Sequence, residues 1–187
     1  GIVSTDAQFR YFPQAAQLSE NLLNFFRQTG PAYSLFLLFF KNLKIDMVAG
    51  PVLVQHVLGI VTALLVFNYF KRINLILAFF VTLFVYFSWI AIWLEHAILR
   101  EAITSFFFTA LVLMTTLAAK DQKFLKPQFG LLAGTIGLIL VFLRIEFAVI
   151  FILMPLILFI ARKKEFAALK ATDKMFLKWI FVCNLPV

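Results

Sequence analysis

The sequence predicts an all-α protein built as a polytopic bundle of transmembrane helices, and three observations carry that prediction. Of the 187 residues, 63% are hydrophobic and only 14% are charged, whereas a soluble domain has roughly a quarter of its residues charged. Phe occurs 25 times, which suits helices that can turn aromatic side chains toward lipid. Apolar stretches of about 18 residues or more recur, and this length crosses the hydrocarbon core of a bilayer.

Five stretches are apolar enough to be membrane spans. We expect them at residues 51–70, 73–94, 98–119, 128–143 and 146–161, and residues 176–187 would begin a further span. Short charged segments separate them, and Gly-Pro or Lys-Arg pairs mark several of their ends. Residues 1–187 are therefore expected to form a single transmembrane domain.

Residues 1–46 precede the first span and are amphipathic rather than uniformly apolar. Over residues 6–29, Phe, Leu and Tyr recur at helical spacing among charged residues, a pattern typical of a helix lying in the membrane interface. Gly30-Pro31 would end this helix. The apolar run within 32–45 is too short to span a bilayer and predicts a second interfacial or re-entrant segment.

The long apolar stretch 128–161 is interrupted near its middle by Arg144 and Glu146. As one helix it would be about 51 Å long, which exceeds a hydrocarbon core of about 30 Å. A single helix would also place both charges near the bilayer centre, where each costs at least about 2.5 kcal/mol. Two shorter spans with a polar tip between them avoid both problems.

Positive residues gather in the loops on one side of these five spans. They are Lys71, Arg72, Lys120, Lys123, Lys126, Arg162, Lys163, Lys164, Lys170 and Lys174. The positive-inside rule places that side in the cytoplasm of a multi-pass protein, in a bacterial inner membrane or an equivalent one. These clusters account for most of the net charge of +8, so we expect no nucleic-acid partner.

Side chains able to do chemistry gather on the opposite, non-cytoplasmic side. They are Asp6, Arg10, Tyr11, Arg27, Tyr33, Gln55, His56, Glu95, His96, Arg100, Glu101, Arg144 and Glu146. The sequence has no glycine-rich phosphate loop, Cys/His zinc cluster or Gly-x-Ser-x-Gly motif. A carboxylate with several cations near the interface suits base-assisted transfer to an acceptor and recognition of a lipid phosphate.

The order of several short motifs resembles the GT-C superfamily of integral membrane glycosyltransferases. Residues 4–16, Ser-Thr-Asp-Ala-Gln-Phe-Arg-Tyr-Phe-Pro-Gln-Ala-Ala, and then Gly-Pro-Ala-Tyr-Ser-Leu at 30–35 are similar to the first outer loop of that family. This loop typically has an acidic residue, a nearby Tyr and a Pro-x-Tyr segment. Residues 54–65 resemble the second transmembrane helix of the family, and residues 99–101 resemble the acidic start of the fourth. Residues 130–146 are similar to a glycine-rich helix that ends in an Arg-Pro-type break.

The resemblance runs in order along essentially the whole chain, with departures. The family often has two adjacent acidic residues where this chain has Asp6-Ala7, and Ile145 stands where Pro is usual. The family's first transmembrane helix and its C-terminal half have no counterpart within residues 1–187. We therefore expect a fragment or a reduced relative of such an enzyme.

The resemblance implies a function and a set of site residues. Members of the GT-C superfamily, among them dolichyl-phosphate-mannose mannosyltransferases and aminoarabinose transferases, move a sugar from a polyprenyl-phosphate donor to an acceptor on the non-cytoplasmic face. Asp6 would be the catalytic base or the carboxylate that orients the acceptor. The residues expected to bind substrate or lipid phosphate are Arg10, Tyr11, His96, Arg100, Glu101 and Arg144. Some members need a divalent cation and others do not, and the resemblance assigns no metal ligand here.

A structural role is the alternative for each of these residues. Asp6 would then cap the helix that follows, and the outer-face arginines would be interfacial residues whose charged ends reach water or partners of nearby carboxylates. Gln55 and His56 are expected to pack helices together. On this alternative the chain is a non-catalytic membrane scaffold that contacts lipids and other membrane subunits of a larger complex.

Overall fold

The computed structural model describes residues 5–28, 30–88, 96–120, 127–150 and 153. Every regular element in these residues is helical and none is a strand, so the prediction of an all-α chain is confirmed for them. The chain divides into two compact units, residues 1–106 and 107–187, and each is described by itself. The expected loops at 121–126 and 162–174, most of the expected last span and the stretch 176–187 lie outside the described residues.

The N-terminal part of the first unit folds as two helical segments separated by Asn21. A π-helical turn, Ala7–Tyr11, runs into α1, Phe12–Glu20, which ends where Asn21 adopts extended backbone angles (φ −151°, ψ 113°). The Asn21 side chain then accepts a hydrogen bond of 2.9 Å from the backbone N–H of Leu23 and opens a 3₁₀ turn, Leu22–Arg27. Because this capping bond competes with the helix, the prediction of one helix over 6–29 is wrong.

Gly30 and Pro31 separate this segment from α2, Pro31–Asn42, as the sequence predicts. Gly30 has left-handed backbone angles (φ 71°, ψ 51°), which glycine adopts without a steric penalty, and Pro31 occupies the first turn of α2, where no backbone N–H is needed. At 12 residues, α2 is about 18 Å long, too short to span a bilayer.

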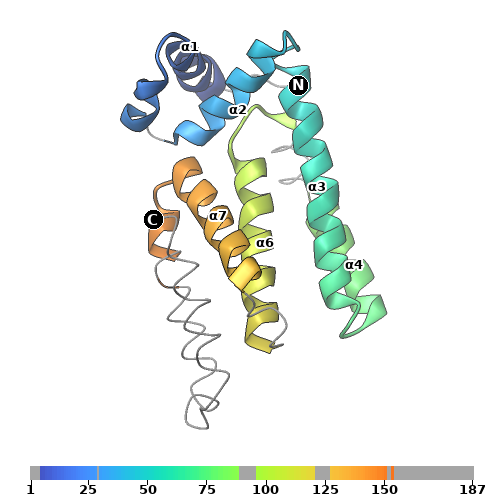
Figure 1. Ribbon diagram of the computed structural model, residues 1–187. Coiled ribbons are helices and arrows are strands. Elements are labelled where there is room, and N and C mark those ends of the chain that lie inside the picture. The colour runs from blue at the N-terminus through green and yellow to red at the C-terminus, as the bar shows by residue number, and fades with distance from the viewer. Residues whose placement is uncertain (1–4, 29, 89–95, 121–126, 151–152, 154–187) are drawn as a thin grey trace. The chain divides into compact units, whose positions relative to one another are not determined.

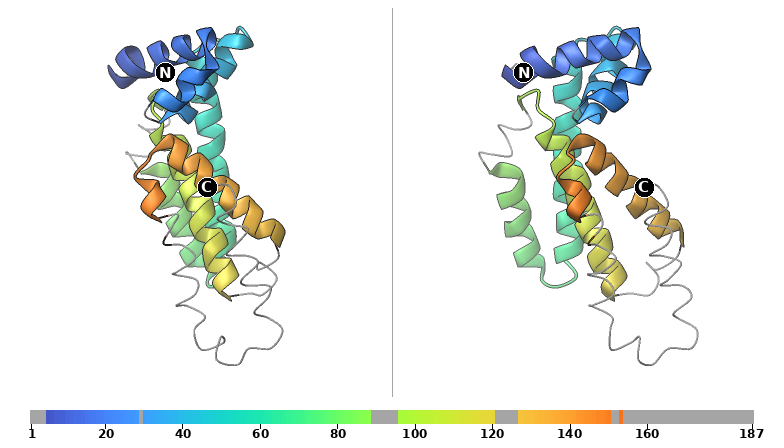
Figure 2. Two further views of the ribbon diagram at one scale, coloured as in Figure 1. Left: turned by 60° about the vertical axis from the view of Figure 1, so that its left-hand side comes forward. Right: turned by 90° about the vertical axis from the view of Figure 1, so that its left-hand side faces the viewer.

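Hydrogen bonds between side chains hold α2 against α1. The Ser34 hydroxyl donates to Oε1 of Gln14 at 3.0 Å, and the Lys41 ammonium donates to the Ser19 hydroxyl at 3.0 Å. Two views of the ribbon show α1 and α2 lying crosswise at the N-terminal end of α3, Ala49–Phe70 (Figures 1 and 2). Helices α1 and α2 therefore lie together at one end of the long helix α3.

The start of α3 is fixed by one carboxylate and one glycine. Oδ1 of Asp46 accepts hydrogen bonds of 2.7 Å from the backbone N–H groups of Val48 and Ala49. A Cβ added at Gly50 would lie 2.6 Å from Cδ1 of Phe40 in α2. The absence of a side chain at Gly50 therefore lets α2 and α3 approach closely.

A short turn after α3 leads into α4, Leu75–Phe87, which packs beside α3 as the second arm of a hairpin (Figure 1). Asn74 adopts extended backbone angles and its side chain accepts a hydrogen bond of 3.0 Å from the N–H of Leu77, which starts α4. The span expected at 73–94 thus begins with α4, and its last residues, 89–94, lie outside the described part.

Two further helices complete the described chain. Helix α6, Glu101–Lys120, begins in the first unit and ends in the second, and α7, Pro127–Leu143, lies in the second. After α7 the chain turns at residues 145–146 and is helical again over residues 147–150. Among the described helices, α3 and α6 are long and apolar enough to cross a membrane, and α4 and α7 are shorter apolar helices.

Candidate functional site

In the first unit, the buried side chain of Tyr11 lies between the ring of Tyr33 and the guanidinium of Arg10. Its side chain is 1% exposed, and its ring contacts that of Tyr33 edge to face with a centroid separation of 4.8 Å. The guanidinium carbon of Arg10 lies 5.7 Å from the centre of the Tyr11 ring, within the range of a cation–π contact. The segment 7–20 is thereby packed on α2 through aromatic contacts at its buried face.

Four charged residues, two from each end of the first unit, act on the Tyr11 phenol. Burial is the largest cause, and it raises the pKa of the phenol above its ordinary value. The positive charges of Arg100 and Arg10 oppose this rise, and the negative charges of Glu101 and Asp6 add to it. The fold therefore brings Asp6, Arg10 and Tyr11 near Arg100 and Glu101, although about ninety positions separate the two groups. These are five of the seven residues that the sequence predicts for the site.

Tyr33 belongs to the same cluster, although the predicted site does not include it. The side chain is fully buried, and burial, followed by the proximity of Tyr11 and of Glu101, raises the pKa of its phenol. Its hydroxyl has no hydrogen-bond partner among the described residues. The Pro-Ala-Tyr segment at 31–33 is the one signal in the sequence that could have added Tyr33.

Asp6 is exposed and stands directly before the π-helical turn. Its side chain makes no capping hydrogen bond to that turn, so the capping role considered for Asp6 is wrong for this helix. A solvent-exposed carboxylate close to Arg10 and Tyr11 can accept a proton from a bound group. The side chain of Arg27, the other arginine in this part of the chain, lies outside what the structure describes.

Arg100 and Glu101 are neighbours at the start of α6 and form a loose pair. Nε of Arg100 lies 3.9 Å from Oε1 of Glu101, and the two side chains are 12% and 31% exposed. That separation is too long for a hydrogen bond between these two atoms. Both charges act on the Tyr11 phenol, with opposite effects on its pKa.

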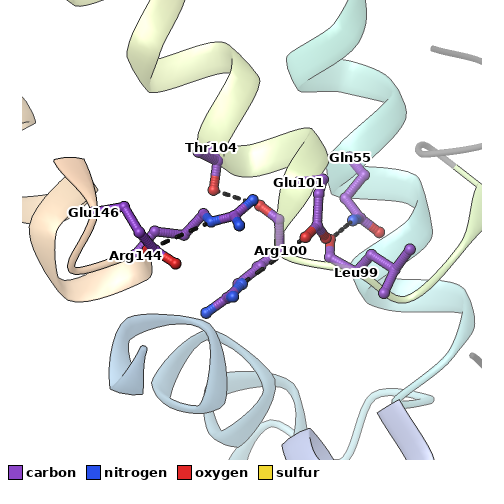
Figure 3. A network of polar contacts seen from close by, with 7 residues as sticks. All are labelled: Gln55, Leu99, Arg100, Glu101, Thr104, Arg144 and Glu146. Carbon is purple, nitrogen blue, oxygen red and sulfur yellow. Dashed lines mark hydrogen bonds and ion pairs between the residues drawn. The ribbon is translucent and has the colours of Figure 1, made fainter. Parts of the chain in front are cut away.

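The segment that carries Arg100 is tied to α3 at two points. Nε2 of Gln55 donates a buried hydrogen bond of 2.7 Å to the carbonyl of Leu99 (Figure 3). The ring of His56 contacts that of His96 edge to face with a centroid separation of 4.5 Å. The sequence predicts only helix packing for Gln55 and His56, because nothing in its local pattern links residues 55 and 56 to a segment 40 or more positions away.

Arg144 lies in the second unit, directly after α7. Its Nε is 3.7 Å from Oε2 of Glu146, and the two side chains are 35% and 65% exposed (Figure 3). A solvent-exposed pair of this kind contributes little to stability. A phosphate-binding role for Arg144 together with Arg100 stays a prediction, because the two arginines belong to different units.

Within the part of the chain that the structure describes, no three His, Cys, Asp or Glu side chains come together in a way that could hold a metal ion. The chain matches no protein-family model, no curated protein and no solved structure. The resemblance to the GT-C superfamily therefore stays a prediction from the sequence motifs.

Proposed function

We propose that the chain is a multi-pass membrane protein whose Lys/Arg-rich loops face the cytoplasm. The exposed surface of its helices supports this. Within the most apolar stretch of each helix, only 39% of α3 and 22% of α6 is buried inside the chain. The core helix of a soluble protein would be mostly buried. Along α4 only Ala78 is buried, and large apolar side chains such as Phe84, at 78% exposure, cover the rest of the helix. Lipid is the solvent in which such a surface is stable.

We further propose that this protein is, or belongs to, a GT-C-like glycosyltransferase that uses a polyprenyl-phosphate sugar donor on the non-cytoplasmic face. The convergence of Asp6 and Arg10 with Arg100 and Glu101 around the Tyr11 phenol is the observation that carries the proposal. It supplies a carboxylate able to take a proton and guanidinium groups able to bind a phosphate.

The proposed reaction follows from these two kinds of group. The Asp6 carboxylate accepts the proton of an acceptor hydroxyl, and the hydroxyl oxygen forms a bond to the anomeric carbon of the donor sugar. The bond between that carbon and the phosphate oxygen breaks, and the polyprenyl phosphate leaves with the electron pair. Arg100, assisted by Arg10, offsets the negative charge that develops on the leaving phosphate.

Release of polyprenyl phosphate from lipid-linked sugars, with the chain in lipid nanodiscs, tests this proposal. Asp6→Asn keeps the shape of the side chain and removes the base, so transfer should fall by about 10²- to 10⁴-fold. Glu20→Gln, which removes an exposed carboxylate at the end of α1, is the matched control and should leave the rate unchanged. If the folded parent chain releases no more lipid phosphate than Asp6→Asn, the scaffold role replaces the transferase role.

A further inference from the structure

Gln55 is a fully buried polar residue in the mostly apolar helix α3. Its Nε2 lies 2.7 Å from the carbonyl oxygen of Leu99. A carbonyl oxygen can only accept a hydrogen bond, so the amide must point its NH₂ group toward Leu99 and its oxygen away. Its Oε1 is buried and has no hydrogen-bond partner among the described residues. The bond to Leu99 is therefore the contact that offsets the cost of burying the amide, and it marks a defined attachment point on α3.

The attachment point lies directly before Arg100, and a second residue fixes the other side of it. Both the hydroxyl and the backbone N–H of Thr104 donate to the Arg100 carbonyl, at 2.8 and 2.9 Å. The segment that enters α6 is thus held by Gln55 at Leu99 and by the first turn of α6 at Arg100 (Figure 3). The contact between His56 and His96 ties the same segment to α3 three residues earlier.

The backbone at this point governs where the two charges of the site lie. Arg100 and Glu101 directly follow Leu99 along the chain, and Arg100 Nε lies 3.9 Å from Glu101 Oε1. Their positions relative to Tyr11 therefore depend on where α3 holds Leu99. The Gln55 amide is the side chain on α3 that makes a hydrogen bond to this carbonyl.

We infer that Gln55 is a positioning residue, which fixes the Leu99 carbonyl and thereby places Arg100 and Glu101 beside Tyr11. The tether itself is a property of the fold, whereas its effect on a lipid phosphate rests on the proposed function. Gln55 touches no substrate in this account and acts through the segment 96–101.

Two variants of Gln55 separate the tether from the mere presence of a side chain. Gln55→Leu removes the donor and keeps an apolar side chain of similar size. Gln55→Glu keeps the shape but presents a carboxylate to a carbonyl, so it cannot donate when it is ionised. Thr62→Val is the matched control, because Thr62 also lies on α3 and its hydroxyl donates a 2.7 Å hydrogen bond, to Leu58 of the same helix.

Hydrogen–deuterium exchange over residues 96–104, with the chain in nanodiscs, measures the tether directly. Exchange should be faster in Gln55→Leu and, at a pH high enough to ionise the buried carboxyl, in Gln55→Glu, and it should be unchanged in Thr62→Val. Lowering the pH should restore protection in Gln55→Glu alone, because the protonated acid donates to the Leu99 carbonyl again, and burial raises the pKa at which this happens. Parent-like exchange in both Gln55 variants overturns the inference.

Affinity for vesicles that contain a polyprenyl phosphate then tests the effect on the site. Gln55→Leu should bind about 5- to 100-fold more weakly than the parent chain, the range expected when a buried hydrogen bond is lost and its acceptor is left unpaired. Parent-like affinity in a variant whose residues 96–104 exchange faster also overturns the inference. If the parent chain itself does not bind the lipid phosphate while the exchange results hold, the proposed function fails and the tether stands.

Discussion

Tyr33 carries a fully buried hydroxyl that has no hydrogen-bond partner within the described part of the chain. Burying an unpaired hydroxyl costs about 1–3 kcal/mol, so packing alone does not account for a Tyr at this position. Its ring contact with Tyr11 would be equally available to Phe. At the scale of one residue, the oxygen of Tyr33 is therefore the part that a function would use.

Removing that oxygen should not harm the fold. We expect Tyr33→Phe to leave the free energy of unfolding unchanged or to raise it by about 1 kcal/mol, since a buried unpaired hydroxyl is lost and the ring remains. Tyr33→Leu should destabilise the protein, because it also loses the edge-to-face contact, worth about 0.5–1.5 kcal/mol. Unfolding in mixed micelles measures both. A destabilised Tyr33→Phe would mean that the hydroxyl already has a partner.

Asp46 shows how one exposed side chain sets the start of a helix. Two backbone N–H groups donate to its carboxylate, and these hydrogen bonds hold its pKa below the ordinary value, with that from Ala49 the larger cause. A lowered pKa in the folded state means that the carboxylate stabilises the start of α3 at neutral pH. This contribution declines as the pH falls from the ordinary Asp value, about 3.9, through the lower folded value.

Hydrogen–deuterium exchange of the first backbone amides of α3 should show this pH dependence. We expect their exchange to quicken as the pH falls below about 4, beyond the intrinsic pH dependence of exchange. In Asp46→Asn this extra dependence should vanish, because the amide accepts hydrogen bonds at every pH in the range. Identical pH profiles for the parent and Asp46→Asn would show that the capping bonds do not form.

At the scale of elements, the packing of α2 on α3 depends on Gly50. A Cβ there would lie 2.6 Å from Cδ1 of Phe40 and 2.9 Å from Cγ2 of Ile45, distances that require the neighbours to move. Gly50→Ala should therefore destabilise the protein by about 1–3 kcal/mol, although Ala alone favours helix by about 1 kcal/mol. Gly59→Ala, about two and a half turns further along α3, should be neutral or stabilising. Equal stability of the two variants would contradict the close approach of α2 and α3.

The helices could be predicted from the sequence where the local signal is strong, and less well elsewhere. Gly30-Pro31 and the apolar run from Pro51 predict the starts of α2 and α3, because the backbone preferences of glycine and proline and the apolar composition of a helix are local properties of the sequence. The sequence pattern does not predict the break at Asn21, because one Asn gives a much weaker signal than the apolar pattern on either side of it. The tether from Gln55 to Leu99 could not be predicted, because it depends on which helices are neighbours in space.

The site shows the same division between local and spatial information. Asp6, Arg10 and Tyr11 lie within one short stretch, so their proximity follows from sequence alone. Their proximity to Arg100 and Glu101 is a property of the fold, which no local pattern in the sequence predicts. The predicted topology puts Arg144 on the same side of the membrane as these residues. A measurement of the topology is needed to test that placement.

At the scale of the whole molecule, the distribution of positive charge predicts the topology. Cysteines introduced as Lys71→Cys, Lys123→Cys and Lys163→Cys, in a chain with Cys183→Ser, should react with a membrane-impermeant thiol reagent only from the cytoplasmic side. Ile145→Cys should react only from the other side, because it marks the turn after α7. Labelling of position 123 from the non-cytoplasmic side would invert or break this arrangement.

On the proposed function, the residues around Tyr11 bind the phosphate of a polyprenyl lipid. Cross-linking of a photoreactive polyprenyl phosphate to the chain in nanodiscs, mapped by mass spectrometry, tests it most directly. We predict adducts in the segments 6–11 and 96–101 that unlabelled polyprenyl phosphate competes away and that Arg100→Gln reduces at least about tenfold, as expected for the loss of a charge-assisted hydrogen bond. Adducts spread along the exposed apolar surfaces of α3 and α4, with no effect of Arg100→Gln, would contradict the claim.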